Sequence, residues 1–291
     1  MLYTLLWGLA ALLLALVIYA WWIEPAWRLR VVTWRISDPA WAGREPLRIV
    51  VISDLHAGAP HIPLSRVSRI VARANALKPD LAVHLGDYQA AHPFTLGRMT
   101  KGDIIARLAG FTAPLGSYAV LGNHDWWQDT KAAKARTTPE AAQALRDHGI
   151  PLLDNSAIRL RDGKDAFWLI GLGDQRPLDE GPEGEGFDDL DAALNEVTDD
   201  APCILLAHEP DIWPDVPDRV FLTLSGHTHG GQIQIGQWSP MIAASSNEDF
   251  NWGHYTSDGQ HLVLSGGIGC SVAPVRFNVV PEITVIEVSG G

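Results

Sequence analysis

The chain has few cysteines, few basic side chains and a modest share of charged residues, and each shortage excludes a class of protein. Only two of its 291 residues are cysteines, Cys203 and Cys270, so a disulfide-built scaffold is excluded, and no Cys-x-x-Cys pair exists for zinc or redox chemistry. Lys and Arg total 22 against 34 Asp and Glu, which excludes a general electrostatic footprint for nucleic acid. Hydrophobic residues still make up 47% of the chain, which is enough to bury a core and excludes a mainly disordered protein.

The acidic excess is concentrated in one segment. Ten of the acidic residues lie between 179 and 200, where Lys and Arg are absent, and the rest of the chain has nearly equal numbers of acids and bases. The segment begins with several glycines and a proline, so we expect an exposed acidic loop that leads into a short helix.

Residues 1–23 carry no charged side chain. As a helix this run spans about 34 Å, which is enough for the ~30 Å hydrocarbon layer of a membrane. Trp21 and Trp22 close the run, where aromatic rings commonly lie at the lipid headgroups. A cleaved signal peptide would need basic residues before the run and a small-x-small cleavage site after it. Neither is present, so the sequence favours an uncleaved anchor.

Arg28, Arg30 and Arg35 follow the apolar run, and no basic side chain precedes it. The positive-inside rule therefore predicts a single-pass protein of the inner (cytoplasmic) membrane, with its catalytic domain in the cytoplasm; the opposite topology is the alternative. We expect an anchor at 1–23, a juxtamembrane linker at 24–46 and a catalytic domain at 47–291. The arginines alternate with Trp27 and Trp34, a pattern that fits either contact with anionic headgroups or an ordinary entry strand.

Beyond residue 46, short apolar runs alternate with helical patterns, which is typical of an α/β protein, and the strand-rich second half predicts a second sheet. Strands are predicted at 47–53, 81–85, 118–121, 167–170, 204–207, 220–224, 262–264 and 283–288, and helices at 63–78, near 104–109 and at 138–148.

Polar residues recur where these predicted strands end. The carboxyl ends of strands in open α/β sheets are where ligands bind, so we expect these residues to converge. Their donors are carboxylate oxygens, an amide oxygen and imidazoles, a set that suits Mn, Fe or Zn ions and not a structural thiolate site. There are too many donors for one tetrahedral ion. The clusters are Asp54-Leu55-His56, Gly86-Asp87, Gly122-Asn123-His124-Asp125, Ala207-His208-Glu209 and Gly226-His227-Thr228-His229.

In this order, the clusters resemble the motifs of the calcineurin-like metallophosphoesterase family: Asp-x-His, Gly-Asp, Gly-Asn-His-Asp/Glu, His and Gly-His-x-His. The hydrophobic N-terminus and the ending that runs from Gly267-Ile268-Gly269 to Pro281-Glu282-Ile283 are similar to its membrane-associated bacterial branch. That branch includes membrane-anchored phosphodiesterases and enzymes that cleave UDP-2,3-diacylglucosamine in lipid A biosynthesis. The resemblance implies a sandwich of two mixed β-sheets flanked by helices, in four αββα layers.

The resemblance also assigns roles to residues. It places Asp54, His56 and His229 on one metal ion and Asn123, His208 and His227 on a second, with Asp87 bridging the two. His124 would be the acid or charge stabiliser near the leaving group, steered by Asp125. The cofactors would be two divalent ions, Mn²⁺ by preference and Zn²⁺ or Fe as alternatives.

Two ions about 3.5–4 Å apart hold a bridging hydroxide near neutral pH, which attacks phosphorus in line. Arg276 either clamps a substrate phosphate or forms a surface ion pair, and Trp126 either packs against substrate or belongs to the core.

The expected partners are the lipid bilayer and a phosphate-ester substrate, which is amphiphilic if the anchor holds the pocket near the bilayer. We expect no nucleic acid and no protein partner. A phosphoprotein or phosphomonoester phosphatase and a non-catalytic, membrane-tethered metal-binding protein are the alternative functions.

Overall fold

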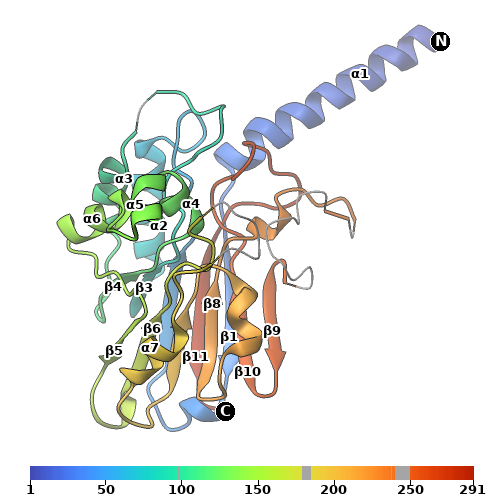
Figure 1. Cartoon of the computed structure of the whole chain (residues 1–291). Coiled ribbons are helices and arrows are strands. Elements are labelled where there is room, and N and C mark those ends of the chain that lie inside the picture. Colours follow the sequence, from blue (N-terminus) through green and yellow to red (C-terminus); the bar gives the residue numbers. More distant parts are fainter. Residues whose placement is uncertain (98, 179–184, 237, 240–249) are drawn as a thin grey trace.

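The computed structural model describes residues 1–97, 99–178, 185–236, 238–239 and 250–291. A long N-terminal helix projects from a body built of two β-sheets and their flanking helices (Figure 1). Most of the acidic segment, including the short helix α7 (Leu190–Asn195), is described, but its beginning at 179–184 lies outside these residues.

The first sheet has five strands in the order β1-β11-β2-β3-β4. It is mixed, because β11 runs antiparallel to β2, whereas the pairs β1–β11, β2–β3 and β3–β4 are parallel. Its strands are β1 (Arg30–Ser37), β2 (Leu47–Ile52), β3 (Leu81–His84), β4 (Ser117–Ala119) and β11 (Glu282–Ser289).

The second sheet has six strands in the order β5-β6-β7-β8-β10-β9. Its four central strands are parallel, and β5 and β9 close the two edges in antiparallel pairing. Its strands are β5 (Ser156–Leu160), β6 (Phe167–Gly171), β7 (Cys203–Leu206), β8 (Val220–Ser225), β9 (Gly253–Ser257) and β10 (Gln260–Leu264).

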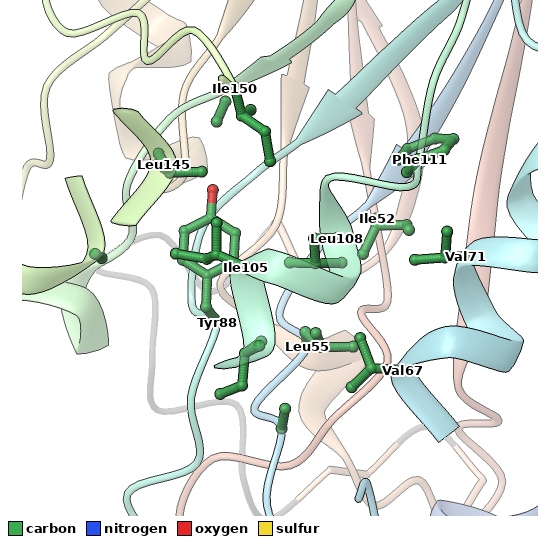
Figure 2. Close-up of a cluster of buried hydrophobic side chains, with 14 of the residues drawn as sticks. Ile52, Leu55, Val67, Val71, Tyr88, Ile105, Leu108, Phe111, Leu145 and Ile150 are labelled. Carbon is green, nitrogen blue, oxygen red and sulfur yellow. The ribbon is translucent and has the colours of Figure 1, made fainter. Parts of the chain in front are cut away.

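Side-chain alternation along the strands divides the interior into layers. On β2, Leu47, Ile49 and Val51 face the second sheet, whereas Val50 and Ile52 face the helices. The outer face of the first sheet is covered by α2 (Leu64–Ala76), α3 (Lys101–Leu108) and α6 (Glu140–Asp147). Figure 2 shows side chains of these helices meeting Ile52 and Tyr88 in this layer.

On the outer face of the second sheet, α7 supplies a thin fourth layer. The predicted four-layer αββα architecture of two mixed sheets is therefore confirmed. Short helical segments join the layers: α4 (Asn123–Trp127), α5 (Thr130–Ala135), η2 (Pro39–Trp41), η3 (Gly163–Asp165), η4 (Pro210–Asp215) and η5 (His229–Gly231).

The N-terminal helix α1 (Leu2–Ile18) continues into a π-helical segment, η1 (Tyr19–Trp27). Leu2–Trp27 is long and apolar enough to cross a membrane, and α1 buries no residue against the body. By contrast, η1 buries Glu24, Pro25 and Ala26, so the helix is docked to the body at its end.

The segment expected as a linker contains a strand of the fold. β1 lies within 24–46 and pairs with β11 over eight consecutive residues, from Arg30 opposite Glu282 to Ser37 opposite Ser289. Of the two interpretations of the arginine-tryptophan pattern, the structure thus shows the entry strand. The exposed positions of this edge strand are Thr33, Arg35 and Ser37, which share one face, whereas Arg30 lies on the other face and pairs with Glu282.

Candidate metal centre

The metal ligands suggested by the motifs lie where the strands end. Asp54 and His56 follow β2, Asp87 follows β3, Asn123 begins α4 after β4, His208 follows β7, and His227 and His229 follow β8. All seven side chains are buried. The two sheets therefore deliver donors from both sides to one place.

The first donor group combines Asp54, His56, Asp87 and His229, whose candidate ligand atoms lie within 4.8 Å of one another. The Nε2 atoms of His56 and His229 are 3.1 Å apart. His229 Nε2 is also 3.5 Å from Asp54 Oδ1, and His56 Nε2 is 3.2 Å from Asp87 Oδ2. Two imidazole nitrogens and two carboxylate oxygens converging in a buried space are a donor set suited to a divalent cation.

The second group joins His208 and His227 to Asn123, and Asp87 is shared with the first. His227 Nδ1 lies 3.0 Å from Asn123 Oδ1. His208 Nε2 lies 3.4 Å from Asp87 Oδ2 and has no hydrogen-bond partner in the described part of the chain. Because Asp87 Oδ2 faces both His56 and His208, its position fits a bridging carboxylate between two ions.

Contacts behind the donors fix their orientation. The His208 ring is held by its Nδ1 against the Leu85 carbonyl, which turns Nε2 toward Asp87. Asp54 accepts a hydrogen bond from the backbone N–H of His227 (2.9 Å) and another from the hydroxyl of Ser53 (2.5 Å). His208 and Asp54 are thus held in orientation by the chain itself.

The backbone of the site is unusual. Five of the candidate ligands have a positive φ, which non-glycine residues adopt rarely and at a cost in energy: Asp54, His56, Asp87, His227 and His229. Gly122 is also required, since a Cβ there would lie 2.5 Å from Asp87 Oδ1 and 2.7 Å from His208 Nε2. Strain concentrated on these loops is characteristic of a functional site.

Burial and neighbouring groups shift the pKa values of the side chains at this centre. Burial acts to raise the pKa of Asp87, but the imidazoles of His208 and His124 outweigh it and hold that pKa well below its ordinary value. For His208, burial acts to lower the pKa, and Asp87 raises it well above the usual range. Burial and the neighbouring His56 lower the pKa of His229, which keeps that imidazole in the neutral form that binds metals.

His124 stands beside the first donor group. Its ring centroid is 4.9 Å from that of His56 and 4.9 Å from that of Trp127, and its Nε2 is 3.0 Å from the Ser271 hydroxyl. Burial lowers the pKa of His124 to about 4, with Asp87 opposing the shift. The imidazole is therefore neutral near pH 7, which suits a hydrogen-bonding stabiliser of the leaving group better than a standing imidazolium acid.

Asp125 differs from its expected role. Its carboxylate accepts hydrogen bonds from the backbone N–H groups of Asp87 (2.9 Å), Tyr88 (3.2 Å) and Gly122 (3.0 Å). It therefore ties together the loops after β3 and β4 and does not steer the His124 ring. Asp125 therefore positions the loop that carries Asp87.

Arg276 is neither a substrate clamp nor part of a surface ion pair. Its guanidinium is fully buried and donates to the carbonyl oxygens of Gly266, Gly269 and Val279, with one nitrogen 3.3 Å from His229 Nδ1. With these donors committed to backbone, Arg276 supports the loop behind His229. Trp126 belongs to the core, because it is buried in the layer under the helices and packs edge-on against Phe187.

Two residues near the second group carry no role in the motifs. Glu209 is fully buried, and its Oε1 lies 3.9 Å from His227 Nδ1 without a hydrogen-bond partner in the described residues. Arg176, which is partly exposed, places a guanidinium nitrogen 3.4 Å from His227 Nε2. Glu209 stands directly after a predicted ligand and was detectable on that ground; Arg176 lies in a loop with no sequence signal.

Comparisons with known proteins identify the family. The family model described as calcineurin-like phosphoesterase matches residues 47–231. The uncharacterized metallophosphoesterase YkuE of Bacillus subtilis is 32% identical over 84% of this chain and 79% of its own length. Phosphodiesterase YaeI of Escherichia coli is 28% identical over 92% of this chain and 91% of its own.

A transmembrane protein with metallophosphoesterase domain from Danio rerio is 32% identical over 82% of this chain, which covers 52% of that longer protein. The family match covers more than half of the chain and includes every candidate metal ligand. The buried donor groups and these similarities lead to one conclusion: the chain belongs to the calcineurin-like metallophosphoesterase family of metal-dependent phosphoester hydrolases.

Proposed function

We propose that this chain is a membrane-anchored phosphodiesterase or pyrophosphatase that uses two divalent metal ions, Mn²⁺ by preference. The observation that carries the proposal is the pair of buried donor groups that share Asp87 Oδ2. Asp54, His56 and His229 would hold one ion, Asn123, His208 and His227 the other, and Asp87 both. The donors are carboxylate and amide oxygens and imidazole nitrogens, a set that fits such ions. His208 Nε2, which has no hydrogen-bond partner in the described part of the chain, also fits this role.

When bound, the ions neutralise the phosphoryl oxygens and supply an activated water nucleophile. The residues of the chain orient the rest of the reaction. The backbone N–H of His124 donates to Asp87 Oδ1 (2.9 Å), which leaves Oδ2 facing both donor groups. The His124 ring stands at the edge of the centre, where it can donate a hydrogen bond to the leaving oxygen. Arg176, rather than Arg276, is placed to bind a substrate phosphate oxygen.

The substrate we favour is an amphiphile with a phosphodiester or pyrophosphate bond, because an apolar helix is joined to the catalytic body through η1. A nucleotide-linked lipid such as UDP-2,3-diacylglucosamine, which would place the chain in lipid A biosynthesis, is the specific candidate. We place the protein in the cytoplasmic membrane with its catalytic body in the cytoplasm.

The decisive experiment is hydrolysis of bis-p-nitrophenyl phosphate by the full chain in detergent, after metal is removed with chelator and Mn²⁺ is restored. We expect turnover to return with Mn²⁺ and to be lost in His124→Ala, while His148→Ala, which changes an exposed histidine at the end of α6, keeps wild-type turnover. A strong preference for phosphopeptides or monoesters would replace the diesterase proposal. Stoichiometric metal binding without turnover on any ester would favour the metal-binding protein.

The same preparation tests the lipid substrate. We expect UDP-2,3-diacylglucosamine in mixed micelles to be cleaved faster than bis-p-nitrophenyl phosphate at equal concentration. If it stays intact while simple diesters are hydrolysed, the lipid-precursor assignment fails and the reaction class stands.

A further inference from the structure

Beyond residue 27, few large apolar side chains are exposed in the described part of the chain, and most of them lie in three loops. These side chains are Phe94, Leu96, Ile235, Trp238, Trp252 and Val272. All but Trp252 lie within residues 92–97, 233–239 and 271–275. We call Phe94, Leu96, Ile235, Trp238 and Val272 the apolar rim. Single exposed hydrophobics are ordinary on a protein surface, whereas such a concentration marks an interaction site.

The three loops are all joined to η1, where the apolar helix meets the body. Phe94 packs edge-on against Trp21, with ring centroids 4.9 Å apart. The backbone N–H of Arg276, just after the third loop, donates to the Ala20 carbonyl (2.9 Å). The second loop is attached to the same place, since Gln234 N–H donates to the Phe277 carbonyl and Phe277 packs against Tyr19.

The length of α1 sets the depth of these contacts in a membrane. Its 17 residues span about 26 Å, which is less than the ~30 Å of the hydrocarbon layer. About three more residues complete the span, which places Tyr19, Ala20 and Trp21 at the boundary between the hydrocarbon layer and the interfacial region. The loops packed on these residues must then lie at the level of the lipid headgroups.

The composition of the loops suits that position. Residues 92–97, 233–239 and 271–275 contain no Asp, Glu, Lys or Arg, although the protein as a whole has a net charge of −12. Acidic side chains there would be repelled by anionic lipids, and their absence removes this penalty. Aromatic and aliphatic side chains on short loops are the groups that insert at a bilayer interface.

We propose that the apolar rim inserts into the surface of the lipid bilayer that α1 spans and holds the mouth of the metal centre against it. Val272 adjoins Ser271, whose hydroxyl is 3.0 Å from His124 Nε2, so an inserted rim opens the centre toward lipid headgroups. An amphiphilic phosphodiester then reaches His124 by a short movement out of the bilayer and does not cross water. This inference rests on the proposed membrane-anchored function and adds the surface that delivers the substrate.

The test uses the full chain in phosphatidylethanolamine–phosphatidylglycerol vesicles, with a polarity-sensitive fluorophore on a single introduced cysteine. Cys203 and Cys270 are buried, and labelling of the wild-type chain measures their background. The rim sites are Leu96→Cys, Trp238→Cys and Val272→Cys, which are 65%, 61% and 70% exposed. The matched control is Asp162→Cys, whose side chain is fully exposed beyond β5, at the opposite end of the strands from the metal centre.

We expect blue-shifted emission and strong quenching by nitroxide-labelled lipids at the three rim sites, and neither at residue 162. Aqueous emission at the rim sites would overturn the inference. A blue shift without lipid quenching would also overturn it, because a second copy of the chain would then cover the rim.

Flotation of the same vesicles and hydrolysis of bis-p-nitrophenyl phosphate separate the two proposals. If the chain floats and hydrolyses the diester while the rim labels stay aqueous, the rim inference fails alone. If the chain does not float, the membrane part of the proposed function fails as well.

Discussion

At the scale of single residues, the site is defined by which atoms are left facing the centre after the local hydrogen bonds are made. His208 uses Nδ1 on the Leu85 carbonyl and presents Nε2, and Asp87 uses Oδ1 on the His124 N–H and presents Oδ2. Both donors are oriented by groups that are not themselves candidate ligands, so we expect the loss of one ligand to leave the rest of the centre in place.

We therefore predict that Asn123→Ala and His208→Ala each lose the second metal ion but keep the fold. Bound Mn²⁺, measured by elemental analysis, should fall from two ions per chain to one. Diester turnover should fall by on the order of a hundredfold or more, since even the residues that orient metal ligands matter at the ten- to hundredfold level. Wild-type rates in both variants would refute the two-metal assignment.

The two arginines near the centre should respond differently to substitution. Arg176→Gln should raise the KM for a diester about tenfold or more while leaving metal content unchanged, because a phosphate contact is removed. Arg276→Gln should instead lower the melting temperature, since the buried carbonyl oxygens of Gly266, Gly269 and Val279 lose their donor. Steady-state kinetics and thermal unfolding of both variants measure these two effects. A raised KM in Arg276→Gln alone would reverse the roles assigned to the two arginines.

At the scale of elements, the docking of η1 depends on a side chain from α2. Arg66 is buried, and its guanidinium donates to the carbonyl oxygens of Pro25, His61 (3.0 Å) and Arg28 (3.1 Å). Burial lowers the pKa of Arg66 to about 10, so the group stays charged at neutral pH.

Arg66→Met should therefore release η1 from the body without disturbing the metal centre. We expect hydrogen exchange of residues 19–28 to be at least tenfold faster, with bound Mn²⁺ unchanged. Arg69→Met, an exposed position one turn along α2, is the matched control and should exchange as the wild type does. Equal protection of η1 in both variants would show that Arg66 does not hold it.

The sequence predicts elements that are apolar along their length better than those at the edges. The eight expected strands and three expected helices are all present, because buried parallel strands such as β7 are continuous apolar runs. The edge strands β5 and β9 were not predicted, and β1 was only one of two interpretations of its segment, since these strands carry Arg, Ser and His in place of a continuous apolar run.

The same distinction applies to the site. The metal ligands follow strand ends and are visible as motifs, whereas the role of Arg276 depends on carbonyl groups from a loop that meets it only in the folded chain. Arg176 likewise comes near His227 through tertiary packing alone, which no local sequence pattern records.

At the scale of the whole molecule, a buried histidine links stability to pH. His84 lies in the interior on β3, and burial lowers its pKa to about 4. Its Nε2 is 3.0 Å from the Ser117 hydroxyl, and Phe111 packs edge-on against the ring. The unfolded chain takes up a proton near pH 6.5, whereas the folded chain does so only near pH 4.

The contribution of His84 to the free energy of unfolding is therefore complete above pH 6.5. It is lost as the pH falls through 6.5 toward 4, by about 3 kcal/mol in total. We predict that His84→Phe flattens the fall of the unfolding free energy across this window. Urea unfolding at pH 7, 5.5 and 4.5 measures it, with His148→Phe as the exposed control. Equal pH slopes in wild type and His84→Phe would contradict the assignment.

Topology is the second whole-molecule prediction. Arg28, Arg30 and Arg35 lie on the body side of the apolar helix, so a reporter fused after residue 291 should be active when it requires the cytoplasm and silent when it requires the periplasm. Activity of a periplasm-only reporter would reverse the orientation while leaving the metal centre as described.

The pairing of β1 with β11 has a consequence for how the chain is made. Residue 30 meets residue 282 across 252 positions of sequence, and at 5–20 residues per second the ribosome needs roughly 13–50 s to supply the partner. During that interval the side of β2 that β11 will cover remains an open edge. For the proposed membrane-anchored form, a ribosome that stalls late would leave a tethered chain with an unpaired strand at the membrane surface, where chaperones and proteases would have to clear it.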